Sequence, residues 1–207
     1  TDTGGTPLAP ALMYNDSRAR DEASRISSHA TAESAAQGAT SGLPKLLYLQ
    51  TRYPQARHVL HQADWVAGKL CNRFDFSDAN NALKTGYDVV NDCWPAWLDN
   101  LGVNRRLLPT VYTPGSYIGD ISAHWSHYFH LPATTKVIAG TTDSIAAFMA
   151  TGANQPGEAV TSLGSTLVLK IISEQPVFAP QFGIYSHRLG KLWLAGGASN
   201  SGGAVLR

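Results

Sequence analysis

The chain has 207 residues, 43% of them hydrophobic, which is enough to bury a core and to form one large domain or parts of two. Its formal net charge is +1 without a basic block, which argues against a nucleic-acid-binding or membrane-surface protein. No apolar run reaches the roughly 20 residues of a membrane span. Cys71 and Cys93 are too few and too far apart for a metal framework, and indicate reduced thiols in a cytosol-like compartment.

The first half of the sequence predicts a strand followed by helices. Residues 2–7 favour a β-turn and residues 8–14 a strand. We expect a mostly exposed helix over residues 17–37, a second from Ser41 to Tyr53 that Pro54 ends, and a third around residues 59–70. The asparagine-rich residues 73–86 indicate a loop that enters a helix. Residues 94–98 open another helix, and residues 109–119 form a turn-rich connector.

Three histidines, His124, His127 and His130, fall at i, i+3 and i+6 of a predicted short helix. Metal ligation needs converging side chains supported by a second shell. The neighbouring sequence offers neither a cysteine nor a Glu-x-x-His pattern, so solvated or interfacial histidines are favoured over metal ligands.

Residues 136–150 carry the candidate chemistry. Residues 137–139 suit a buried strand, Gly140 breaks it, and from Ile145 the apolar spacing becomes helical, with Thr142 or Asp143 available as N-cap. Asp143 is then either an ordinary helix cap or a general base that takes a proton from a substrate hydroxyl.

The segment that follows predicts a hairpin. Two β-prone runs within residues 158–170 are joined by Gly164-Ser165-Thr166, a turn that is ordinarily only a hairpin but also offers N–H groups and hydroxyls to a phosphate. Residues 183–187 and 192–194 favour paired strands. Residues 196–203 favour a glycine-rich loop that opens a helix.

Two of these motifs together resemble the FGGY family of carbohydrate kinases, namely the Gly-Thr-Thr-Asp-Ser loop at 140–144 and the Ser-Leu-Gly-Ser-Thr turn at 162–166. Asp143 and Gly164 are 164 − 143 = 21 residues apart, as in that family. Further matching segments follow family order at residues 11–18, 64–70, 78–86, 108–111 and 193–202. Within the family, the chain is similar to ribulose- and xylulose-type kinases of cyanobacteria and plants.

The resemblance implies an α/β, ribonuclease H-like fold of the actin/hexokinase/Hsp70 ATPase superfamily, with parts of two domains. Residues 1–155 would belong to the sugar-binding domain and residues 156–207 would begin the ATP-binding domain. The family's first phosphate loop would precede Thr1 and its adenosine-binding motif would follow Arg207. We therefore expect a central fragment.

The implied activity is transfer of the ATP γ-phosphoryl group to a sugar hydroxyl, with Mg²⁺ and with a ketopentose such as D-ribulose or D-xylulose as substrate. Asp143 would be the general base and Gly164, Ser165 and Thr166 would hold the nucleotide phosphates. The sugar side would comprise Tyr14, Asn15, Asp16, Thr142 and Asp143, although alternation along a strand prevents Tyr14, Asn15 and Asp16 from all facing one sugar. We expect a cytoplasmic protein, or a plastid one in a plant, without nucleic-acid or membrane partners; the oligomeric state is open.

Three alternatives remain open. One is a kinase for glycerol or another polyol. Another is a non-catalytic fragment or interaction module of the same fold, because a fold does not guarantee activity. The last is an actin-like filament or chaperone ATPase, which residues 14–16 and 140–143 fit less well.

Overall fold

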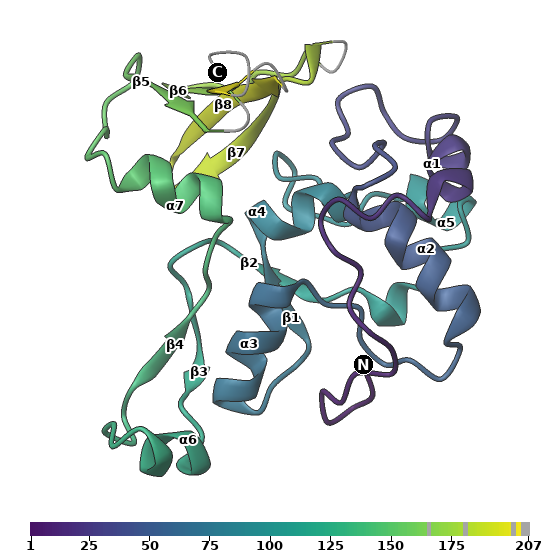
Figure 1. Cartoon of the computed structure of the whole chain (residues 1–207), viewed down its shortest axis with the longest axis vertical. Helices are drawn as coiled ribbons and strands as arrows, with labels where there is room; N and C mark the ends of the chain where they lie inside the picture. Colours follow the sequence, from purple (N-terminus) through teal and green to yellow (C-terminus); the bar gives the residue numbers. More distant parts are fainter. Residues whose placement is uncertain (165–166, 180–181, 200–201, 204–207) are drawn as a thin grey trace.

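The computed structural model describes residues 1–164, 167–179, 182–199 and 202–203. It is a mixed α/β structure in which a helical region, a two-stranded arm and a four-stranded sheet follow one another along the chain (Figure 1). No helix among these residues is long and apolar enough to cross a bilayer.

The helical region is built from short helices around a leucine-rich core. Its helices are α1 (Arg20–Ile26), α2 (Gly42–Arg52), α3 (Gln62–Cys71), α4 (Ala79–Ala82) and α5 (Trp97–Asn100), with the 3₁₀ turns η1 (Leu83–Thr85) and η2 (Arg105–Leu107). Leu43, Leu46 and Leu47 on one face of α2 are buried against Ile26 and Leu98. Burying such a side chain contributes about 1.5–3 kcal/mol, so this apolar stripe holds the region together.

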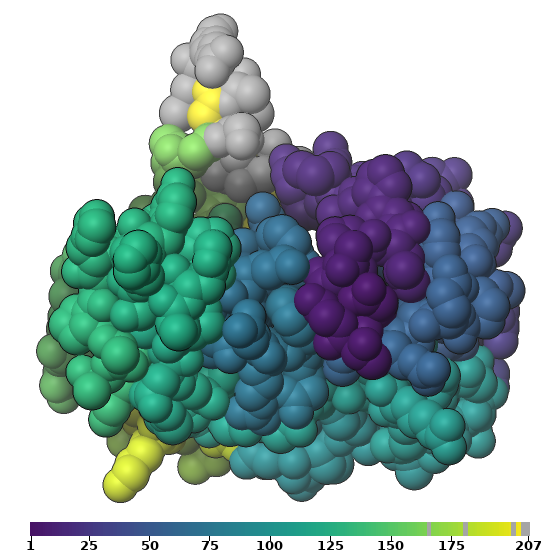
Figure 2. Space-filling model, turned by 90° about the horizontal axis from the view of Figure 1, so that it is seen from below, coloured from purple at the N-terminus to yellow at the C-terminus, as the bar shows by residue number. Residues whose placement is uncertain are grey.

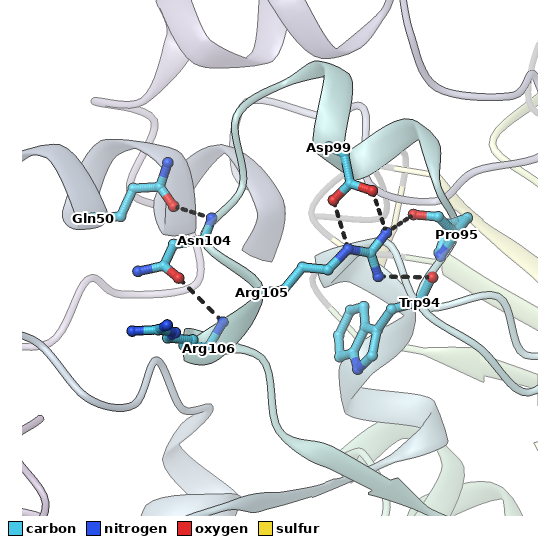
Figure 3. A network of polar contacts seen from close by, with 7 residues as sticks. All are labelled: Gln50, Trp94, Pro95, Asp99, Asn104, Arg105 and Arg106. Carbon is cyan, nitrogen blue, oxygen red and sulfur yellow. Dashed lines mark hydrogen bonds and ion pairs between the residues drawn. The ribbon is translucent and has the colours of Figure 1, made fainter.

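A network of polar contacts also ties α2 to the segment after it (Figure 3). The guanidinium of Arg105 donates to both carboxylate oxygens of Asp99, at 2.6 and 3.1 Å, and to the carbonyl oxygens of Trp94 and Pro95. The side chain of Gln50 on α2 accepts from the N–H of Asn104 at 3.0 Å. Residues 94–104 are thereby held in one conformation without regular secondary structure.

Two small sheets extend from this region. The parallel pair contains β1 (Phe76–Asp78) and β2 (Thr110–Tyr112). The antiparallel pair contains β3 (Tyr117–Asp120) and β4 (Lys136–Ile138), and forms an arm that carries α6 (Ala123–Tyr128). In Figure 2 the arm, in green, lies against α3, in blue. An apolar groove at this contact is lined by Val66, Leu70, Phe129, Leu131 and Ile138.

The last part of the chain is an antiparallel sheet in the order β5-β6-β8-β7, with one face covered by α7 (Asp143–Met149). Its strands are β5 (Ala159–Leu163), β6 (Leu167–Ser173), β7 (Tyr185–Leu189) and β8 (Leu192–Ser199). Ile145 and Phe148 of α7 are buried against Ile172 and Leu194. The position of α7 on the sheet is therefore set by apolar packing.

Several expectations are confirmed. Helices α2, α3 and α7 form where the apolar spacing predicted them, and α2 ends at Arg52 just before Tyr53-Pro54. The hairpins β5–β6 and β7–β8 also form as predicted. The division of the chain at residues 155/156 stays a prediction.

Other expectations are wrong. Residues 8–14 form no strand, and Pro7 and Pro10 explain why, since neither has an N–H to donate to a sheet. The helix expected over residues 17–37 covers only Arg20–Ile26. The loop expected over residues 73–86 contains the buried strand β1, and the connector at 109–119 contains β2 and the start of β3. Residues 196–199 belong to strand β8 rather than to a loop.

A buried carboxyl group lies at the start of α3. Asp64 is 3% exposed, and its Oδ2 accepts from the backbone N–H of His61 at 3.1 Å. Burial raises the pKa of Asp64 to about 7, against the smaller effects of bonds from Ser77 and His61. Burial also lowers the pKa of His61, whose ring contacts the Thr85 hydroxyl, to about 4. Both groups therefore favour their neutral forms.

The pKa of Asp64 predicts how stability depends on pH. Folding raises this pKa from 3.8, so the folded state retains a proton that the unfolded chain loses, and the contribution declines as pH rises from about 4 to 7. Asp64→Asn keeps the oxygen acceptor and removes the titration. We expect the unfolding free energy of the variant, relative to wild type, to increase by about 2 kcal/mol between pH 5 and pH 7.5. Urea unfolding at both pH values measures it; an equal difference at both would contradict this description of Asp64.

Candidate functional site

Asp143 lies at the beginning of α7, four residues beyond the last strand of the arm plus its glycine turn. Thr142, in extended conformation, occupies the N-cap position, and Asp143 is the first helical residue rather than the cap. Asp143 is exposed, and its Oδ1 accepts from the N–H of Ser144 at 2.7 Å. Within the described part of the chain no other donor reaches this carboxylate. An external hydroxyl group can therefore approach its second oxygen.

The predicted phosphate turn follows strand β5. Leu163 pairs with Leu167, so residues 164–166 close the β5–β6 hairpin. Gly164 is exposed, and its carbonyl oxygen accepts from the N–H of Gly203 at 2.6 Å. A Cβ on Gly203 would lie 2.9 Å from that oxygen, so the contact requires a glycine there. Ser165 and Thr166 lie outside the described residues.

Lys170 of β6 joins the hairpin to the start of α7. Its Nζ donates to the hydroxyl of Ser144 at 2.9 Å, and the residue is 7% exposed. Burial lowers the pKa of Lys170 to about 8, although the nearby Asp143 carboxylate acts in the opposite direction. The strand that leaves the phosphate turn thus reaches the residue next to Asp143.

The predicted sugar-side residues Tyr14, Asn15 and Asp16 lie in a turn instead of at a strand end. Tyr14 is 83% exposed and Asn15 is exposed. Asp16 forms an ion pair of 2.8 Å with Arg18, and bonds from Arg18 hold the pKa of this carboxyl below its usual value. Nζ of Lys45 donates to the carbonyl oxygen of Met13 at 2.7 Å and so anchors the turn to α2.

A set of lysines spans the region between that turn and Asp143. The charge of Lys84, on η1, acts after burial to lower the pKa of both Lys45 and Lys170. Lys45 in turn is within electrostatic range of Asp16, and Lys170 of Asp143. The structure therefore brings Thr142 and Asp143 together with Lys170, keeps residues 14–16 in a separate turn, and places positive charge between the two.

Sequence reasoning missed Lys170, Lys84 and Asn80. A signal for Lys170 was present, since it shares the inward parity of Val168 and Ile172 on a hydrophobic strand and so had to be buried. Lys84 and Asn80 are brought to the site by contacts far apart in sequence, and local patterns carry no sign of them.

Asn80 of α4 joins the helical region to the sheet and to the loop before Asp143. Its Oδ1 accepts from the N–H of Arg188 at 2.8 Å, and its Nδ2 donates at 3.0 Å to the carbonyl oxygen of Arg188 and to the hydroxyl of Thr141. Asn80 is 1% exposed. The guanidinium of Arg188 adds a bond to the carbonyl oxygen of Val89 and lies 4.2 Å from the ring centre of Trp193.

The histidines and acids of the described ranges do not gather into a metal site. No group of three or more His, Cys, Asp or Glu side chains there could hold a metal ion. His124 and His127 lie on α6 as predicted, whereas His130 follows it with a positive φ of 54°. The rings of His124 and Trp125 contact each other with centres 4.7 Å apart.

No family model matches the chain. Among curated proteins it is 26% identical over 184 residues to the xylulose kinase of Lactococcus lactis, covering 81% of this chain and 36% of that protein. It is also 26% identical over 205 residues to the xylulose kinase of Escherichia coli, covering 90% and 40% of the respective lengths. The chain thus spans 36–40% of the length of these relatives.

Solved structures share the fold. The xylulose kinase of Rhodospirillum rubrum superposes with a TM-score of 0.87 at 22% identity, covering 100% of this chain and 44% of that one. A glycerol kinase of Plasmodium falciparum, solved with ADP, superposes with a TM-score of 0.80 at 18% identity, covering 98% and 44%. The expected α/β, actin-like ATPase fold is therefore confirmed.

The buried bonds of Asn80 can be tested by truncation. Asn80→Ala leaves the N–H and carbonyl oxygen of Arg188 without these partners, so we expect the unfolding free energy to fall by about 2–4 kcal/mol. Asn81→Ala is the matched control, because the side chain of the neighbouring Asn81 bonds only to Asp78 of its own turn. Denaturant unfolding of both variants measures the difference, and equal losses would contradict a bridging role for Asn80.

Proposed function

We propose that the chain forms part of an FGGY-type carbohydrate kinase that transfers the γ-phosphoryl group of ATP to a hydroxyl of a ketopentose. The observation that carries the proposal is the open carboxylate of Asp143, which Lys170 connects to the strand leaving the Gly164 turn. The similarity to two xylulose kinases, each over more than four fifths of this chain, supports the same reaction class.

In this proposal Asp143 accepts the proton of the attacking sugar hydroxyl. An exposed carboxylate with one oxygen held by the Ser144 N–H presents its other oxygen in a fixed direction. Phosphoryl transfer depends mainly on positioning and electrostatics, and a general base of this kind orients the nucleophile. Thr142, at the N-cap position, adds a hydroxyl on the same side.

The Gly164 turn would contact the phosphates of ATP. Its glycine leaves the backbone accessible, Gly203 approaches it closely, and Ser165 and Thr166 supply hydroxyl groups in the sequence. Mg²⁺ fits this arrangement, because it commonly takes one or two carboxylates together with phosphate oxygens, and Asp143 is an available carboxylate. Bound there, the ion would neutralise charge on the phosphates.

On the sugar side we propose Tyr14, Asn15 and Asp16 together with Thr142 and Asp143. Lys45 holds the turn of residues 14–16 in place, which gives the exposed polar groups a defined position. The names of the relatives favour D-xylulose or a related ketopentose such as D-ribulose. The shared fold of a glycerol kinase keeps polyols as the competing substrate class.

The proposal extends to the organisation of the protein. Residues 1–155 would contribute to a sugar-binding domain and residues 156–207 to an ATP-binding domain, with the reaction in the cytoplasm. The competing hypothesis, a non-catalytic module of the same fold, is supported by the partial coverage of the relatives.

Asp143→Asn tests the general base. It keeps the size of the side chain and removes the proton acceptor, so we expect kcat for sugar phosphorylation to fall by about 10²–10⁴-fold while ATP binding changes little. The measurement is ADP release by the full-length gene product with Mg-ATP and, in turn, D-xylulose, D-ribulose and glycerol.

Asp21→Asn is the matched control, because Asp21 is also an exposed acid in the first turn of a seven-residue helix, α1. It should leave kcat within about twofold. A kcat of Asp143→Asn within tenfold of wild type would sink the assignment of the base. Absence of sugar-dependent ADP release from the wild type would favour the non-catalytic module.

A further inference from the structure

Lys170 is the only lysine or arginine that is buried among the described residues. A strand interior next to an apolar core is a costly place for a charged side chain unless the charge is paired or used. Met or Leu would fill the same place without that cost. The question is what the charge does there.

The surroundings of Lys170 are shaped to admit its side chain. On the neighbouring strand β8, Gly196 lies directly opposite Lys170. A Cβ on Gly196 would lie 3.0 Å from Cα and Cγ of Lys170 and would also collide with the carbonyl oxygen of Leu169. A glycine at this register therefore gives the lysine stem its room.

The ammonium group points to the residue that follows Asp143. Nζ of Lys170 donates to the Ser144 hydroxyl at 2.9 Å, and the N–H of Ser144 donates to Oδ1 of Asp143 at 2.7 Å. Side chain and backbone of one serine thus relay between the lysine and the carboxylate. A shift of the lysine would move the first turn of α7 and with it Asp143.

The charges around Lys170 come from three elements. Asp143 on α7 is the acid that faces it, Lys84 on η1 is a second cation, and His187 on β7 is buried. Burial, with further effects of Lys170 and Lys84, lowers the pKa of His187 to about 3, so this ring is neutral at neutral pH. Asp143 is thus the anion among the groups that Lys170 faces.

We propose that Lys170 is a positioning residue for phosphoryl transfer, which holds the start of α7 through Ser144 and keeps a positive charge beside the Asp143 carboxylate. This rests on the proposed function. The charge favours the ionised form of Asp143, which accepts the proton of the sugar hydroxyl. The sugar oxygen forms its bond to the γ-phosphorus as the bond from that phosphorus to the leaving oxygen of ADP breaks. Lys170 exchanges no atom.

The test compares Lys170→Met and Lys170→Arg in the full-length gene product. Lys170→Met should fold at least as well as wild type, because it removes a buried charge, and should lower kcat by about 100-fold, as misplacement of a catalytic group does. KM for ATP and for the sugar should stay within about threefold. Lys191→Met, in the exposed turn between β7 and β8 of the same sheet, is the control and should leave all parameters unchanged.

The dependence of kcat on pH separates positioning by charge from mere packing. Wild-type kcat should decline above about pH 8, where Lys170 loses its proton. Lys170→Arg should move this decline to higher pH, because arginine stays charged. Lys170→Met should abolish the decline and move the acidic limb, which reports Asp143, upward.

Each outcome decides between the two levels of the proposal. An active wild type together with a folded Lys170→Met variant whose kcat stays within threefold and whose alkaline limb is unchanged would overturn the role of Lys170 alone. A wild type without sugar-dependent ADP release would overturn the kinase assignment and, with it, this role. A kcat that falls while the alkaline limb stays in place would show that Lys170 acts through packing, and would also overturn the proposal.

Discussion

The packing of α7 on the four-stranded sheet determines where every candidate functional group lies. Ile145 and Phe148 are buried against Ile172 and Leu194, so the helix has one position and its first residue, Asp143, one location. The same face of β6 carries Lys170 one inward position before Ile172. The apolar contact and the polar contact with Ser144 therefore belong to one surface, in which the alternation of the strand sets the spacing between core and site.

Local chemistry made part of this arrangement predictable. The β5–β6 hairpin and the start of α7 follow from short runs with glycine turns, and their partners lie within about 30 residues. The open carboxylate of Asp143 could also be expected from its place after a glycine turn. Such features depend on neighbours in sequence, so one sequence contains the information needed to place them.

Other parts depended on partners that a sequence does not point to. Strand β1 is buried and pairs in parallel with β2, more than 30 residues later, while its own sequence is polar enough to indicate a loop. Asn80 meets the backbone of Arg188 across 108 residues. The turn of residues 14–16 was expected at a strand end, but Pro7 and Pro10 withhold the N–H donors that a strand requires. Where long-range pairing decides the structure, local propensity gave the wrong answer.

The polar groups at the junction divide into neutral and charged ones according to what each contacts. Burial keeps the ring of His187 neutral and favours the neutral forms of His61 and Asp64, and these groups stabilise the framework without adding charge. Lys170 and Asp143 lie at the edge of the same junction, where one is buried and the other is exposed. An ion pair that was purely structural would gain from burial of both partners in direct contact. Separation by Ser144 leaves the carboxylate open to an external group, and this is the arrangement that a proton acceptor for an incoming hydroxyl requires.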